Sequence, residues 1–365
     1  MINTSNLFRH ALAILAYLVL GLSSQTARSQ TIHVKVKGET IIGKPVVWND
    51  HTVMVLERDG KVSEFSPQSA SGYKLLDKGF RLYSRSELYN LLKREFDEYE
   101  VSATNQYLIV HPRGQKQLWT TRFEQIYRSV LHYFTVRNLE SRPSTLPFVA
   151  IVFRNESEYL SYLSKQEGRS VYGSLGVYLQ DTNRIYLFDA TNAQADGSEG
   201  YEDWLVNATT VIHEAAHQTA FNTRVQRRFG ASPAWVSEGI GTLFEAKGVW
   251  NAFKYRLERD RVNEQRIYQF KQTVNEGNFE ETIRSLITSD RIVKKSPDRG
   301  YGTAWAMTFF ATERRPVQYA KYLKTMYKRE PFNIYTVQQR IADFEQSFGK
   351  TELFVRDMQN FYRDL

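Results

Sequence analysis

The chain has 365 residues, enough for about two ordinary domains, and 42% of them are hydrophobic and 24% charged. This composition is typical of a folded protein and excludes a wholly disordered chain and a membrane protein with many spanning helices. The net charge of +8 comes from scattered basic residues without a basic block, so we expect no nucleic-acid binding. Because the chain has no cysteine, disulfides and thiolate metal sites are excluded, and any metal must be bound by His, Asp or Glu.

The first 29 residues predict a secretory signal peptide. They contain no acidic residue, and an apolar stretch at 11–22 leads to small residues, Ala27 and Ser29, at positions that a signal peptidase prefers. The apolar stretch is too short to span a bilayer, which takes about 20 residues. The sequence therefore predicts a secreted or periplasmic bacterial protein with no stable membrane span after cleavage. An uncleaved N-terminal anchor is the alternative.

Residues 30–77 predict a small all-β module of barrel-like shape. Short apolar runs are separated by turn residues, and the pair Asp59 and Gly60 between two such runs is a strong β-hairpin signal. Ser84 and Glu87 have the spacing of a helix capping box, so we expect a linker helix within residues 78–98. The sequence names no partner for the β module.

Residues 99–365 predict one α+β domain, in which a mostly antiparallel sheet is followed by a helical part. Strands are expected at 107–110 and 148–153, and a β-hairpin at 177–188. After residue 189 the pattern is helical to the C-terminus. Strands first and helices afterwards are typical of α+β folds.

The segment HEAAH at residues 213–217 is the motif that indicates metal binding and proton transfer. His213 and His217 are one helical turn apart, so both imidazoles project from one face and can bind one metal ion. Glu214 can then take a proton from a water molecule at the metal. Because no histidine follows His217, a third protein ligand must be a carboxylate. The alternative is a buried helix whose two histidines are only hydrogen-bonded.

Glu238 is the expected third ligand. It lies on a second predicted helix, for which Ser232 suits the N-cap and Pro233 the first turn. Two histidines from one helix and a glutamate from the next resemble the gluzincin metallopeptidases. Their aminopeptidase members carry a Trp-x-x-Glu-Gly segment, which Trp235, Glu238 and Gly239 match. A carboxylate that only favours the helix N-terminus is the alternative.

The resemblance to gluzincins implies three further roles. Glu245, seven residues beyond Glu238, looks like the carboxylate that orients a ligating histidine. Tyr301, just before an apolar helix, resembles the tyrosine that stabilises the transition state. The hairpin at 177–188 precedes the metal helix, as does the edge strand on which gluzincins bind an extended peptide. Ion pairing for Glu245 and plain packing for Tyr301 are the alternatives.

The run from about residue 100 to the C-terminus is also similar to a family of secreted bacterial proteins, domain of unknown function 1570. The similarity lies in residues 99–104, 107–112, 213–218 and 235–245. It implies a gluzincin-like fold and metal site, and it names no substrate.

Two hypotheses from different classes follow. The first is a secreted zinc metallohydrolase, and in particular a peptidase acting on a peptide or protein. Its Zn²⁺ would be bound by His213, His217 and Glu238, with Glu214 as general base and Tyr301 as oxyanion stabiliser. The second is a non-catalytic envelope-binding protein with a structural metal. An intact Glu214 favours the first, because a structural site needs no base. Internal cleavage and cleavage from a chain end both stay open.

Overall fold

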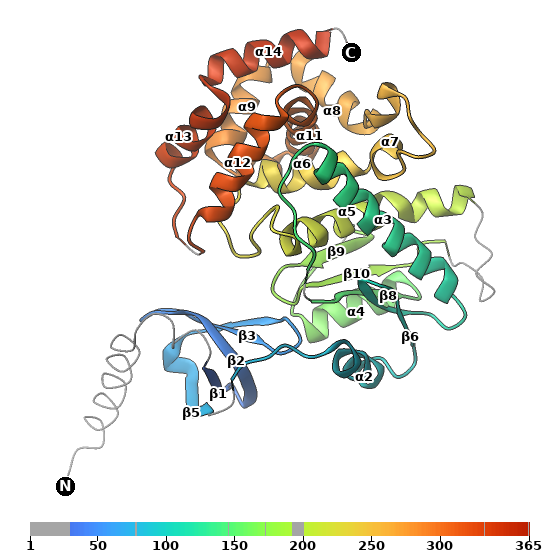
Figure 1. Cartoon of the computed structure of the whole chain (residues 1–365), viewed down its shortest axis with the longest axis vertical. Helices are drawn as coiled ribbons and strands as arrows, with labels where there is room; N and C mark the ends of the chain where they lie inside the picture. Colours follow the sequence, from blue (N-terminus) through green and yellow to red (C-terminus); the bar gives the residue numbers. More distant parts are fainter. Residues whose placement is uncertain are drawn as a thin grey trace. The chain divides into compact units, whose positions relative to one another are not determined.

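The computed structural model describes residues 30–365 except 77–78, 145, 172, 192–200, 332 and 364, and for residues 201–206 only the backbone. The predicted signal segment lies outside the described residues. The chain divides into two compact units, one ending at Asn90 and one beginning at Leu91, which are treated separately (Figure 1). No helix in the described part is long and apolar enough to cross a membrane.

The first unit is a five-stranded antiparallel sheet of order β4-β3-β2-β1-β5. Its strands are β1 (Thr31–Val36), β2 (Glu39–Trp48), β3 (Val53–Glu57), β4 (Val62–Phe65) and β5 (Ala70–Leu76). The expected hairpin at Asp59 and Gly60 is confirmed, since β3 pairs with β4 and φ is 94° at Gly60. Six apolar side chains form the core of this unit: Ile32, Val34, Ile41, Val53, Val55 and Phe65.

The expected barrel-like closure of this module is wrong. β4 and β5 are the two ends of the sheet and, within the described residues, do not pair with each other. The sheet is nevertheless curled, because β-bulges interrupt the pairing of β1 with β5 and of β2 with β3. The ring of Trp48 on β2 therefore lies 5.7 Å from that of Tyr73 on β5. An alternating pattern predicts which side chains are inside, but not whether the last strand reaches the first.

The linker helix expected within residues 78–98 is α2 (Arg85–Glu95). Its capping box is present: the Glu87 carboxylate accepts a hydrogen bond from the Ser84 N–H at 2.8 Å, and the Ser84 hydroxyl accepts one from the Glu87 N–H at 3.3 Å.

The second unit begins with a mixed five-stranded sheet of order β6-β7-β8-β10-β9. Its strands are β6 (Glu100–Ala103), β7 (Tyr107–His111), β8 (Phe148–Phe153), β9 (Gly176–Leu179) and β10 (Arg184–Phe188). The expectation of a mostly antiparallel sheet is wrong at the centre, where β8 is parallel to both β7 and β10. Only the outer pairs are antiparallel.

Helices on both faces of this sheet explain its parallel centre. Helix α3 (Lys116–Val136) connects β7 to β8 and packs with α5 (Tyr201–Asn222) on one face, while α4 (Glu156–Gln166) lies on the other (Figure 1). Strands covered on both faces are buried along their whole length, as β7, β8 and β10 are. Their continuous apolar runs, without alternation, are the sequence signal of this arrangement.

The C-terminal half is helical, as expected. Helix α6 (Ala234–Phe244) packs between α5 and α11 (Pro297–Arg314). The other helices are α7 (Lys247–Trp250), α8 (Glu264–Asn275), α9 (Phe279–Thr288), α10 (Arg291–Lys295), α12 (Pro316–Lys328), α13 (Val337–Phe348) and α14 (Thr351–Arg363). A continuous core joins α3, α5, α6 and α11 to one face of the sheet, so the helices that carry the predicted site are fixed by packing.

Candidate metal centre and active site

Helix α5 brings His213 and His217 together as their spacing predicts. Their Nε2 atoms are 2.9 Å apart, and both residues are buried. Apolar residues of α5 pack against the sheet and α3, which leaves the two imidazoles directed toward α6. The histidines thus form two corners of a compact donor set.

Helix α6 supplies the third corner. One carboxylate oxygen of Glu238, Oε2, lies 3.4 Å from Nε2 of His213 and 3.5 Å from Nε2 of His217. Ligand atoms bound tetrahedrally to zinc at 2.0–2.1 Å lie about 3.4 Å from one another. Both nitrogen–oxygen distances match this value, and the nitrogen–nitrogen distance of 2.9 Å is about 0.5 Å shorter, so the three atoms could hold a zinc ion once the two rings move slightly apart. Within the described residues they are the single His, Asp and Glu group that could bind a metal ion.

The expected cap of α6 is wrong. Ser232 does not cap the helix; Pro233 occupies the N-cap position and has no side-chain donor or acceptor to offer. Instead, the Asp290 carboxylate accepts a hydrogen bond from the Ala234 N–H at 2.9 Å, and Arg340 of α13 holds that carboxylate at 2.7 and 2.9 Å. The start of the helix that carries Glu238 is thus fixed by residues more than 50 positions further along the chain.

Electrostatics at the three donors favours a positive charge among them. Burial by itself lowers the pKa of His213, but hydrogen bonds to Glu238 and Glu245 outweigh it and raise the pKa to about 10. Burial by itself raises the pKa of Glu238, but the adjacent histidines hold it well below its usual range. The carboxylates therefore stabilise either a proton on His213 or a cation bound in its place.

Glu245 lies directly behind His213, as predicted. Its Oε1 accepts a hydrogen bond from Nδ1 of His213 at 2.9 Å, which leaves Nε2 of the same ring to face the donor set. Arg266 binds both oxygens of Glu245 at 3.0 Å, and Asn263 donates to Oε2 at 2.8 Å. Burial by itself raises the pKa of Glu245, but His213 and Arg266 outweigh it and lower the pKa. Arg266 and Asn263 were not predicted, and no spacing in the sequence marks them.

Two glycines let α6 approach its neighbours. A Cβ added to Gly241 would lie 2.6 Å from Cε1 and 2.7 Å from Nε2 of His213, so only glycine leaves room for this ring. A Cβ on Gly239 would lie 2.0 Å from the Thr308 hydroxyl of α11. The role of Gly241 was not predicted, although its place three residues after Glu238 puts it on the same side of the helix.

Glu214 is held by the edge of the sheet. Its Oε2 accepts a hydrogen bond from the backbone N–H of Tyr178 on β9 at 2.7 Å. In an antiparallel pair, alternate residues direct their N–H groups away from the partner strand, so Tyr178 faces the free edge and its neighbours face β10. Burial raises the pKa of Glu214 despite the charges of the two histidines, as suits a group that takes up a proton.

Tyr301 completes the predicted group. It lies in the first turns of α11, with its ring 6.3 Å from that of His213 and 5.4 Å from the Arg266 guanidinium. Burial, reinforced by the charges of Glu238 and Glu214, raises the pKa of its phenol well above the usual range. The phenol therefore keeps its proton at neutral pH and can donate a hydrogen bond. The structure thus brings all six predicted site residues together.

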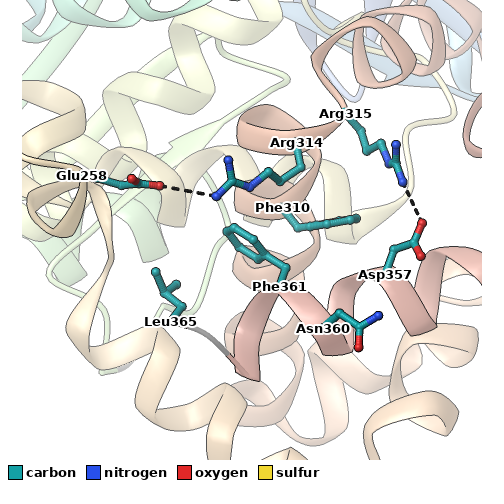
Figure 2. A pocket seen from close by; sticks show the side chains of 8 residues that line it. All are labelled: Glu258, Phe310, Arg314, Arg315, Asp357, Asn360, Phe361 and Leu365. Carbon is teal, nitrogen blue, oxygen red and sulfur yellow. Dashed lines mark hydrogen bonds and ion pairs between the residues drawn. The ribbon is translucent and has the colours of Figure 1, made fainter.

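A cavity of about 610 Å³ lies elsewhere, between α11 and α14 (Figure 2). Its charged side chains are paired, Arg315 with Asp357 at 2.7 Å and Arg314 with Glu258 at 3.8 Å. None of the predicted site residues lines it. It is therefore a surface feature separate from the predicted site, and each charged side chain that lines it has an oppositely charged partner.

One comparison with known proteins bears on this site. Residues 207–333 match the model of a family described as a protein of unknown function, DUF1570. This segment is similar to the DUF1570 family. The match is shorter than the expected run from about residue 100, but it contains all six predicted site residues as well as Gly241 and Arg266. No curated protein matches the chain.

Proposed function

We propose that this protein is a secreted zinc-dependent metallohydrolase of the gluzincin type, and in particular a peptidase. The observation that carries the proposal is the position of Glu214, a partly buried carboxylate held beside three donors that could bind zinc together with a water molecule as the fourth ligand. A purely structural site needs four protein ligands and no base, so this arrangement favours an enzyme over an envelope-binding protein with a structural metal.

The protein's own residues have distinct roles in this proposal. His213, His217 and Glu238 hold the zinc ion, which when bound lowers the pKa of a water molecule and polarises a carbonyl group. Glu214 takes up the proton of the attacking water and passes it to the leaving amine. The phenol of Tyr301, kept protonated by its surroundings, donates a hydrogen bond to the oxyanion as it develops.

A peptide is the substrate class that the neighbouring strand favours. β9 is an edge strand of the sheet and lies against α5, next to Glu214. An extended peptide can add to such an edge through main-chain hydrogen bonds. The identity of the peptide and the position of the cut bond are not part of the proposal.

The test compares the chain from residue 30 on with its Glu214→Gln variant. We expect one zinc per chain in both by elemental analysis, and hydrolysis of a peptide library by the parent alone. Gln is close in size to Glu but takes up no proton, so a loss of turnover with zinc retained would assign Glu214 as the base. Absence of zinc from the parent would refute the site, and equal turnover in both would refute the role of Glu214.

A further inference from the structure

The first turn of α8 lies behind the donor set and contacts it through one carboxylate. Arg266 binds Glu245 with two parallel hydrogen bonds of 3.0 Å, and the side chains of both residues are largely buried, at 15% and 4% exposure. A planar guanidinium matches a carboxylate in this two-point geometry, which fixes orientation as well as distance.

The contact is held from several sides. Asn263 caps α8 by accepting a hydrogen bond from the Arg266 N–H at 3.1 Å, and its amide group donates to Glu245 and to the carbonyl of Thr242. Arg266 also donates to Gln269 at 3.1 Å. The guanidinium therefore has little freedom to move, and it restrains the carboxylate that it binds.

Restraint of Glu245 reaches His213. Because both oxygens of Glu245 are oriented by Arg266 and Asn263, its Oε1 is directed at Nδ1 of the imidazole. A carboxylate there accepts the Nδ1 proton, so the lone pair lies on Nε2, the atom that faces Glu238 and His217.

We propose that Arg266 is a positioning residue for the metal: acting through Glu245, it sets the tautomer and orientation of His213 and thereby the affinity for zinc. The inference rests on the zinc site proposed above. It also assigns a function to α8, whose sequence carries no metal motif.

The test measures the dissociation constant for Zn²⁺ by competition with a chromophoric chelator, on the whole protein. Removing a partner behind a ligand typically weakens metal binding by about 10–100-fold, which is the loss we expect for Arg266→Gln. Arg266→Lys keeps the charge but not the two-point geometry, so its affinity should lie between those of Arg266→Gln and the parent. The visible spectrum of bound Co²⁺ should change in both variants, because it reports the ligand geometry.

The matched control is Arg261→Gln. Arg261 is a partly buried arginine paired with a partly buried glutamate, Glu313, at 3.0 Å, and neither residue is one of the three donors. We expect this variant to lower the unfolding temperature while its zinc affinity stays within about twofold of the parent, since an effect on folding alone does not change the site. Equal zinc losses in Arg261→Gln and Arg266→Gln, or parental affinity in Arg266→Gln, would overturn the inference. A parent that binds no zinc would overturn the proposed function together with it.

Discussion

Alanine at position 241 would put a methyl group against the ring of His213. The added carbon would lie 2.6 Å from Cε1, whereas carbon atoms in contact are about 3.5 Å apart, so the ring must move by about 0.9 Å. Metal bonds tolerate displacements of about 0.2 Å. We therefore expect Gly241→Ala to weaken zinc binding by at least about 100-fold, or about 3 kcal/mol.

The measurement is a chelator competition with Zn²⁺, and a second background tests the physical reason. Within a helix, alanine is more stable than glycine by about 0.5–1 kcal/mol, so the substitution should be stabilising wherever the ring is absent. In a His213→Ala background, Gly241→Ala should accordingly raise the free energy of unfolding by about that amount, because the clash has gone. Unchanged zinc affinity in the single variant, or destabilisation in the double variant, would refute the reasoning.

Three further predictions concern groups around the site and in the core. Tyr178→Pro removes the N–H that holds Glu214 but leaves the β9–β10 hydrogen bonds in place. Its kcat/KM should therefore be about 10–100-fold lower than that of Tyr178→Ala, which keeps the N–H. The zinc content should be unchanged in both variants. Glu313→Gln should cost about 2 kcal/mol in urea unfolding, because Arg137 and Arg261 lose their shared carboxylate. Burial by itself raises the pKa of Glu313, but the two arginines outweigh it and lower the pKa, so its contribution is present at neutral pH. That contribution should be lost as the pH falls below about 4.3, and the loss should be absent in Glu313→Gln.

The three proposed metal-binding residues were predictable because they lie close together in the sequence, on two consecutive helices. Two histidines four residues apart on a helix must share a face, and a glutamate in the next helix can meet them when that helix packs against the first, as α6 does on α5. The exclusion of other ligands also came from the sequence, since the chain has no cysteine and no histidine beyond His217. Composition required only that the third ligand be a carboxylate, and the resemblance of residues 235–239 to the gluzincin segment selected Glu238.

The supports of the site were not predictable in the same way. Arg266, Asp290 and Arg340 are surrounded by residues of ordinary composition, and their partners are 21 to 56 positions away along the chain. An arginine that binds a buried carboxylate has the same local sequence as one that faces solvent. Only the packing of α6 and α8 against α11 determines which charges meet.

Strand direction was missed for a different reason. Counting strands before helices favours an antiparallel sheet, but β7 and β8 are continuous apolar runs rather than alternating ones. Such runs indicate strands covered on both faces, and the two faces can be covered only if helices cross between parallel strands. The long helix predicted between residues 110 and 148 therefore already indicated that the two strands are parallel, since parallel neighbours need a crossover connection of that length.

The contact between Tyr178 and Glu214 limits how a peptide can use the edge of β9. The outward-facing N–H of Tyr178, to which a new strand could bind, is already donated to Glu214 at 2.7 Å. A peptide that adds to this edge must therefore use other main-chain groups of β9 or displace the carboxylate, and displacement would move Glu214 from its present position. The first course keeps Glu214 in place during binding, and it predicts that a peptide analogue that is not hydrolysed leaves the exchange rate of the Tyr178 N–H low. If the analogue instead increased that exchange, Glu214 would have to be released for each substrate.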